Sequence, residues 1–135
     1  MLVFGTANPE GEDDAHRGVY LRRCDIETLI RTNALHGKPV KIEHTGCPVG
    51  HIVSAWKNGN KLDCVLKIND DSIDSMFAQE FIKNRMCPEL SLSYAVTMQN
   101  SADGLTGGKK DFIEVSLVRS GARKDCHIHG FSAQS

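Results

Sequence analysis

The chain has 135 residues, of which 40% are hydrophobic and 24% charged, and its formal net charge is -1. This length predicts one domain spanning residues 1–135, with enough apolar content to fold without disulfide bonds. The near-zero charge argues against a globally basic surface, so neither nucleic acid nor a membrane is expected as a partner. No stretch approaches the ~18 apolar residues of a membrane-spanning helix. The five cysteines follow no signal peptide, which predicts free thiols and an intracellular protein.

The first forty residues predict two short strands and a helix. The strands are expected over residues 2–7 and 18–21, separated by an acidic loop that contains Glu10, Glu12, Asp13 and Asp14. A helix follows, because apolar residues recur at spacings of three and four. Asp25 is expected to cap its N-terminus, and Gly37 followed by Pro39 to end it. Its buried stripe is expected to consist of Ile26, Leu29, Ile30 and Ala34.

The middle of the chain predicts three strands and a second helix. A strand over residues 40–44 precedes strands over 49–57 and 61–69, and Asn58-Gly59 between the last two is a strong hairpin signal. Ser72 is expected to cap the second helix. The buried stripe of that helix is expected to consist of Ile73, Met76, Phe77 and Phe81.

The last third predicts two strands, over residues 89–98 and 111–119, joined by a polar loop over 99–108. In the first strand, alternation places Leu90 and Leu92 on one face and Ser91 and Ser93 on the other. In the second strand the core face is expected to carry Ile113, Val115 and Leu117, opposite Glu114 and Ser116.

These elements predict a mainly β fold of the α+β type, with about six to seven strands and two flanking helices. Most of the strands are joined by hairpins, and a sheet that turns over this often hides its edges by closing. We therefore expect a closed or nearly closed antiparallel β-barrel. The alternative is an open antiparallel sheet with helices on one face.

Three side chains from separate strands have the chemistry of a serine-nucleophile site. A serine hydroxyl needs a base within hydrogen-bonding distance, and the base needs a third group that orients it. Histidine suits the role of base because its pKa lies near neutral pH. Ser91, His44 and Glu114 would supply these groups, although the same residue types also occur as ordinary surface residues.

The turn after the last predicted strand could stabilise an oxyanion. Gly121 and Ala122 offer backbone N–H groups, and Arg123 adds a permanent positive charge. An ordinary surface turn is the alternative interpretation.

Metal or thiol chemistry is the competing interpretation. The segment 126–129 (Cys-His-Ile-His) and the pair Cys47 and His51 contain metal-ligating side chains. Neither follows the paired spacing of zinc sites, so no metal and no cofactor are expected. Cys47 lies three residues after His44, but no sequence neighbour is expected to lower its pKa.

Three sequence blocks occur in a specific order along the chain. Residues 39–44 with 49–53 form a histidine block, residues 90–93 (Leu-Ser-Leu-Ser) a serine block, and residues 112–118 a third block. Together they resemble the herpesvirus assemblins and the tailed-phage prohead proteases. Residues 121–123 fall where assemblins carry an arginine-bearing oxyanion loop. The opening residues 4–7 and 19–21 also fit, so the resemblance covers nearly the whole chain.

The resemblance implies a serine endopeptidase of capsid maturation in which Ser91 attacks and His44 acts as the base. Assemblins use a second histidine as the third member, whereas the phage enzymes have an acidic residue, which here is Glu114. His127 or His129 is the alternative third member if the strand register differs. Gly121, Ala122 and Arg123 would then stabilise the oxyanion.

The resemblance also implies substrates and a place of action. The substrates would be the capsid scaffold protein and the enzyme's own precursor, cleaved after small residues during assembly of the major capsid protein. Cleavage would occur inside immature viral capsids, in the host nucleus for a herpes-like virus or in the bacterial cytoplasm for a phage. A homo-oligomer is compatible, because assemblins act as dimers. The alternatives are an inactive barrel that binds scaffold or capsid protein, and a metal-dependent or thiol hydrolase.

Overall fold

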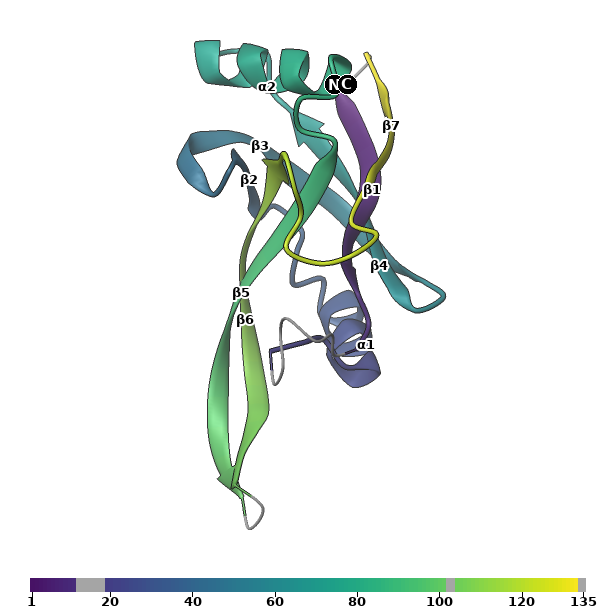
Figure 1. Ribbon diagram of the computed structural model, residues 1–135, viewed down its shortest axis with the longest axis vertical. Helices are drawn as coiled ribbons and strands as arrows, with labels where there is room; N and C mark the ends of the chain where they lie inside the picture. Colours follow the sequence, from purple (N-terminus) through teal and green to yellow (C-terminus); the bar gives the residue numbers. More distant parts are fainter. Residues whose placement is uncertain (12–18, 102–103, 134–135) are drawn as a thin grey trace.

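The computed structural model describes residues 1–11, 19–101 and 104–133, so the acidic residues Glu12, Asp13 and Asp14 lie outside the described residues. The described residues form seven strands and two helices (Figure 1). No helix among them is both long and apolar enough to cross a membrane. In chain order the elements are β1 (Leu2–Pro9), α1 (Arg23–Arg31), β2 (Pro39–Ile42), β3 (Thr45–Asn58), β4 (Lys61–Ile68), α2 (Ile73–Lys83), β5 (Glu89–Ser101), β6 (Gly104–Val118) and β7 (Ile128–Ser132).

The strands form one sheet in the order β5-β6-β2-β3-β4-β1-β7, which confirms the mainly β fold with two helices. The expected all-antiparallel arrangement is wrong, because β2 runs parallel to β6. The closed barrel is not confirmed either. In the described chain the end strands β5 and β7 share no ladder and meet at an isolated bridge between Glu89 and His127.

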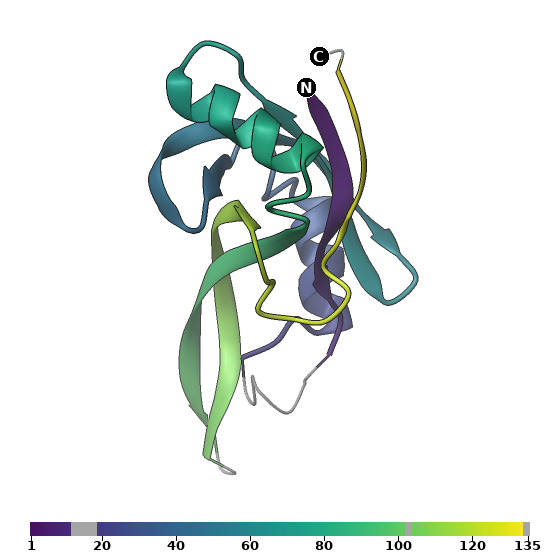
Figure 2. The ribbon, with the colours of Figure 1, turned by 45° about the horizontal axis from the view of Figure 1, so that its top comes forward.

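Two predicted segments have a different structure. Residue Leu21 makes an isolated bridge with Glu10 and belongs to no strand, and Gly18 lies outside the described residues. The expected loop over 99–108 is instead the end of a long hairpin, in which β5 and β6 stay paired as far as Ser101 and Gly104. This hairpin extends away from the rest of the sheet as an arm (Figures 1 and 2).

The predicted N-cap is wrong for the first helix and confirmed for the second. The first helix is capped at Arg22, not at Asp25, which lies in the first turn and accepts a hydrogen bond from the Arg22 backbone N–H (2.9 Å). Ser72 caps α2 as expected and accepts a hydrogen bond from the Ser75 N–H (3.0 Å).

The buried face of α2 is not the predicted one. Its apolar stripe is exposed at Ile73, Met76 and Phe77, whereas Ser75, Ala78 and Ile82 are buried. Small residues on this face let the helix pack closely on β3 and β4, which it crosses at the top of Figure 1.

A β-bulge interrupts the pairing of β5 with β6 beside the polar face of the sheet. Ser93 pairs with Glu114 and Tyr94 with Phe112, so Ile113 is the extra residue and is exposed. The expectation that Ile113 faces the core is therefore wrong, because the bulge reverses its direction. Val115 and Leu117 do face the core, whose largest fully buried side chains also include Leu21, Ile26, Leu29, Leu35, Ile52, Leu62, Leu66, Ile68 and Leu90.

Candidate active site

Two strands present serine hydroxyls and a carboxylate on one face of the sheet. Ser91 pairs with Ser116, and Ser93 pairs with Glu114. The opposite face of β5 carries Leu90 and Leu92, both buried, as alternation predicts. Apolar packing on one face thus fixes the direction of the polar side chains on the other.

The histidine lies in a strained turn between β2 and β3. Glu43 and His44 both have left-handed backbone angles, with φ of 50° and 61°. Such angles are unfavourable for residues other than glycine and persist only where neighbours hold them. Here the Glu43 N–H donates to the Leu117 carbonyl (3.0 Å), and the His44 N–H donates to Ser116 Oγ (2.9 Å).

The turn places the His44 ring between a serine and a carboxylate. Ser91 Oγ lies 3.1 Å from His44 Nε2, and His44 Nδ1 lies 2.5 Å from Glu114 Oε1. An N–H at Nδ1 that donates to the carboxylate leaves the Nε2 lone pair to accept the Ser91 proton. We call these three residues the Ser–His–Glu cluster.

Burial differs sharply among the three members of the cluster. Ser91 and Glu114 are only 8% and 4% exposed, whereas the His44 side chain is 41% exposed. The buried carboxylate is satisfied by two further donors, Ser93 Oγ–H to Oε1 (2.9 Å) and Ser116 Oγ–H to Oε2 (2.7 Å). Glu114 is therefore fixed in position, and one edge of the His44 ring is open to solvent.

The structure brings the turn at residues 121–123 close to β5 but gives its polar groups other partners. The Gly121 N–H donates to Glu89 Oε1 (2.5 Å). Arg123 Nη2 donates to the Val19 carbonyl (2.6 Å) and contacts the Tyr94 hydroxyl (3.2 Å). Ala122 is exposed. A Cβ atom added at Gly121 would lie 3.1 Å from the Leu90 carbonyl, so this turn passes close to the residue before Ser91.

The alternative third members lie outside the cluster. His127 Nδ1 pairs with Glu89 (3.0 Å), and His129 Nε2 hydrogen-bonds to Thr6 Oγ1 (2.9 Å). Each of these two histidines therefore has a partner elsewhere, and of the three candidates for the third member only Glu114 bonds to the His44 ring in the described structure.

The groups considered for metal or thiol chemistry do not converge on one site. Cys126 is buried, and burial raises the pKa of its thiol to about 11. Cys47 is exposed. Among the described residues, no group of three or more His, Cys, Asp or Glu side chains is arranged to hold a metal ion.

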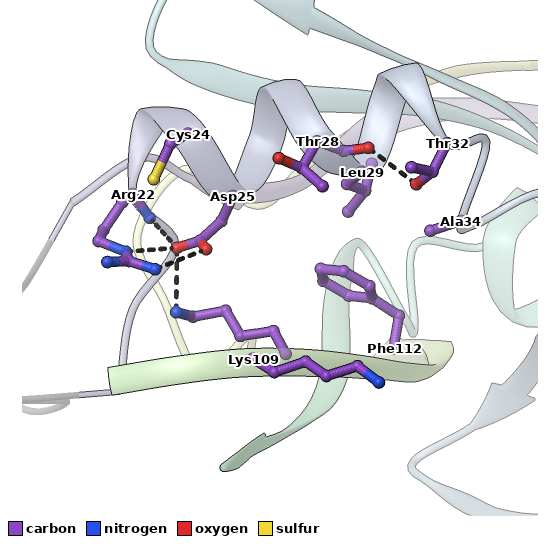
Figure 3. A pocket seen from close by; sticks show the side chains of 10 residues that line it. Arg22, Cys24, Asp25, Thr28, Leu29, Thr32, Ala34, Lys109 and Phe112 are labelled. Carbon is purple, nitrogen blue, oxygen red and sulfur yellow. Dashed lines mark hydrogen bonds and ion pairs between the residues drawn. The ribbon is translucent and has the colours of Figure 1, made fainter. Parts of the chain in front are cut away.

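A cavity of about 530 Å³ lies between α1 and the β6 side of the arm (Figure 3). Asp25 binds both Arg22 (3.0 Å) and Lys110 (2.9 Å) at its rim. Burial opposes the charge on Asp25, but hydrogen bonds from Arg22 and Lys110 outweigh it and lower the pKa of this carboxyl to about 2. None of the residues that line the cavity belongs to the Ser–His–Glu cluster.

Two residues with clear contacts to the site had no role assigned from the sequence. Ser116 bonds both the His44 backbone and the Glu114 carboxylate. Ser116 lies two residues after Glu114 in the same strand, so alternation places both side chains on the polar face of the sheet. That spacing was the only sequence signal for its role. Glu89 holds Gly121 and His127, and no sequence pattern indicated these contacts.

Comparisons with known proteins identify the fold. No family model matches the chain, and no curated protein matches it significantly. A structure of Kaposi's sarcoma-associated herpesvirus protease with a hexapeptide phosphonate inhibitor matches with a TM-score of 0.65 at 17% identity, over 97% of this chain and 65% of that one. The same protease with a dimer disruptor matches with a TM-score of 0.59 at 18% identity, over 98% and 77% of the two chains. The chain therefore has the fold of a herpesvirus protease, as its sequence blocks predicted, and spans about two thirds of the first of these structures.

Proposed function

We propose that this chain is a serine endopeptidase of the capsid-maturation class and that Ser91, His44 and Glu114 form its catalytic triad. One observation carries the proposal: a single imidazole lies 3.1 Å from the Ser91 hydroxyl at one nitrogen and 2.5 Å from a buried carboxylate at the other. The likeness in fold to a herpesvirus protease supports the same class of reaction.

The proposed reaction is acyl transfer to Ser91. As Ser91 Oγ attacks the peptide carbonyl, its proton passes to His44 Nε2, and the carbonyl oxygen becomes an oxyanion. The tetrahedral intermediate then collapses: the C–N bond breaks, and His44 returns the proton to the leaving amine. Water, deprotonated by His44, hydrolyses the acyl-enzyme in the same way. Glu114 keeps the Nδ1–H in place and stabilises the imidazolium at each step.

The turn at residues 121–123 remains the proposed source of oxyanion donors. Contacts with Tyr94 and Glu89 fix its position. Arg123 ties the turn to Tyr94, with the guanidinium carbon 5.6 Å from the ring centroid. Because the Gly121 N–H is bonded to Glu89, the first N–H expected to be available to an oxyanion is that of Ala122. If the contact with Glu89 were lost, the Gly121 N–H could also donate to the oxyanion.

The proposed substrates are a capsid scaffold protein and the enzyme's own precursor, cleaved after small residues inside an immature capsid. A dimer disruptor binds the herpesvirus protease of similar fold, which supports a homo-oligomer for this chain as well.

Cleavage of a proteome-derived peptide library, read by mass spectrometry, tests this function without assuming a substrate sequence. The expected products are new termini that follow small residues. Ser91→Ala and His44→Ala should each lower the rate at least ~10³-fold, because removal of either triad member disables the nucleophile. Ser93→Ala removes a hydroxyl that donates to Glu114 Oε1 but leaves the nucleophile in place, and should lower the rate by no more than about tenfold. The matched control is Ser54→Ala, at an exposed serine of β3, which should retain the wild-type rate.

The third member is tested by comparing carboxylate with histidine variants. Glu114→Gln should lower the rate by roughly 10²–10⁴-fold, since an amide cannot stabilise the imidazolium. His127→Ala and His129→Ala should stay near wild type. The opposite ranking would refute the assignment of Glu114. Absence of cleavage by a folded protein would instead favour a catalytically inactive module that binds capsid or scaffold protein.

A further inference from the structure

The cavity between α1 and the arm has the size of a small-molecule site. Its volume is about 530 Å³, and ligand pockets in proteins measure roughly 300–1,000 Å³. The helix forms one wall, and β6 forms the other (Figure 3). The β-bulge at Ile113 reverses the alternation along β6, so Phe112 faces this cavity whereas Glu114 faces the Ser–His–Glu cluster. The cavity is therefore separate from the proposed catalytic site.

Positive charge is in excess in this cavity. Among the described residues that line it, Arg22, Lys109 and Lys110 are cationic and only Asp25 is anionic. The Lys110 side chain is 4% exposed and bonds to Asp25 (2.9 Å), which also accepts two N–H groups of the Arg22 guanidinium (3.0 Å each). One carboxylate thus balances only one of the two cations that it binds. Lys109 lies 3.7 Å from Asp111, but both side chains are exposed, and such a pair is weak.

The rest of the cavity is lined by apolar side chains. Leu29 and Ala34 lie on the helix side, and the ring of Phe112 faces them from β6 (Figure 3). Tyr94 holds that ring in place, with the two ring centroids 5.8 Å apart. Figure 3 shows Arg22 and Asp25 at one end of the cavity and Phe112 towards the other. A charged end and an apolar end within one cavity are complementary to a molecule that has both characters.

We propose that this cavity binds a small amphipathic anion, a molecule with an aromatic or aliphatic body and one acidic group. The body packs on Phe112 and Leu29. The acidic group pairs with Lys109, in the field of the net positive charge around Asp25. Such a ligand contacts α1 and β6 at once, so it stabilises the folded chain in proportion to its occupancy. The proposal does not depend on proteolytic activity.

The chain carries its own reporter for this site. Cys24 lines the cavity and is exposed, whereas the equally accessible Cys47 lies in β3, outside the lining. The test compares the rates at which iodoacetamide alkylates the two thiols, read by mass spectrometry, with and without sodium naphthalene-2-sulfonate. Ordinary ligand efficiency predicts a Kd on the order of 1 mM for so small a probe. At about 10 mM, the probe should slow alkylation of Cys24 at least ~5-fold and leave Cys47 unchanged.

Matched probes separate the two parts of the ligand. Naphthalen-2-ylmethylammonium keeps the ring but reverses the charge, and methanesulfonate keeps the charge but lacks the ring. Each alone should slow alkylation of Cys24 by less than about twofold at the same concentration, because each offers only one of the two contacts.

Matched variants test the lining. Lys109→Glu should reduce the protection of Cys24 by naphthalene-2-sulfonate to about twofold or less, since it replaces the attracting charge with a repelling one. The control is Arg31→Glu, which makes the same charge change at a residue of α1 that does not line the cavity and should keep full protection. Each protein is compared with itself without the probe, so differences in intrinsic thiol reactivity cancel.

Circular dichroism checks that both variants are folded. Four results would each overturn the proposal: no protection of Cys24 in the wild-type chain, equal protection of Cys24 and Cys47, equal protection by the ammonium probe, and full protection in Lys109→Glu. None of these results bears on whether the chain cleaves peptides.

Discussion

Ser116→Ala should disturb the proposed catalytic site, although the buried Ser116 side chain is not expected to contact a substrate. Ser116 is fully buried, donates to Glu114 Oε2 (2.7 Å) and accepts from the His44 N–H (2.9 Å). A hydrogen bond to a charged group contributes about 1.5–3 kcal/mol, and loss of the acceptor of the His44 N–H costs about 1 kcal/mol more. We therefore expect a loss of about 2.5–4 kcal/mol in the free energy of unfolding, measured by urea denaturation.

The same substitution should lower kcat more than it raises KM. Without Ser116, the left-handed turn at Glu43 and His44 loses one of its two backbone anchors, so the imidazole shifts relative to Ser91. A displacement of about 1 Å costs on the order of 10²-fold in rate. Ser93→Ala is the comparison, because Ser93 is partly exposed and water can replace it. A Ser116→Ala protein with wild-type stability and kcat would refute this reasoning.

Three further predictions concern stability and thiol chemistry. Asp25→Asn should destabilise the chain by about 1 kcal/mol at pH 7, because the pKa of Asp25 in the folded chain, about 2, lies below the unfolded value of 3.8. In urea titrations the difference in stability from wild type should fade as the pH drops from 4 towards 2, and a difference that stays constant would contradict this. Gly50→Ala should cost about 3 kcal/mol or more in thermal or urea unfolding, because its Cβ would overlap the Lys67 carbonyl oxygen; Gly130→Ala, with open space around it, is the control, and equal stability of the two variants would contradict the close approach. Iodoacetamide at neutral pH should label the exposed thiols much faster than the buried ones in the native protein, since burial raises the pKa of the Cys64 thiol to about 12; uniform labelling by mass spectrometry would refute this. The exposed thiols are those of Cys24 and Cys47, and the buried ones are those of Cys64, Cys87 and Cys126.

The sequence predicted most strands because alternation and turn chemistry are local properties. Asn58-Gly59 indicated the β3–β4 hairpin, and the alternation of Leu90 to Ser93 indicated the two faces of β5 correctly. The parallel pairing of β2 with β6 was missed because it depends on which distant strands meet. The β-bulge at Ile113 was missed for the same reason, since it is defined by two strands together.

The second helix and its Ser72 cap were predicted correctly, but its buried face was not, because its apolar stripe was taken to be the buried side. Hydrophobic periodicity shows which side of a helix is apolar, but not what that side packs against. In the structure, Ser75 and Ala78 allow close packing on the sheet, and Ile73, Met76 and Phe77 remain outside.

The order of the three sequence blocks was enough to predict which residues form the candidate site. It was not enough to predict how those residues are arranged in space. Residues 44, 91 and 114 come from three segments far apart in the chain, and their contacts depend on the strained turn and the sheet register. The part played by Ser116 in that turn could be seen only in three dimensions.

Reaction with a peptide phosphonate, mapped by mass spectrometry, tests the central claim most directly. A phosphonate forms a covalent bond only with an activated nucleophile, and such an inhibitor binds the herpesvirus protease of similar fold. We predict one adduct, on Ser91, that disappears in the His44→Ala and Glu114→Gln proteins and persists in Ser93→Ala. No adduct on the folded wild-type chain, or an adduct on a cysteine or another serine, would contradict the account.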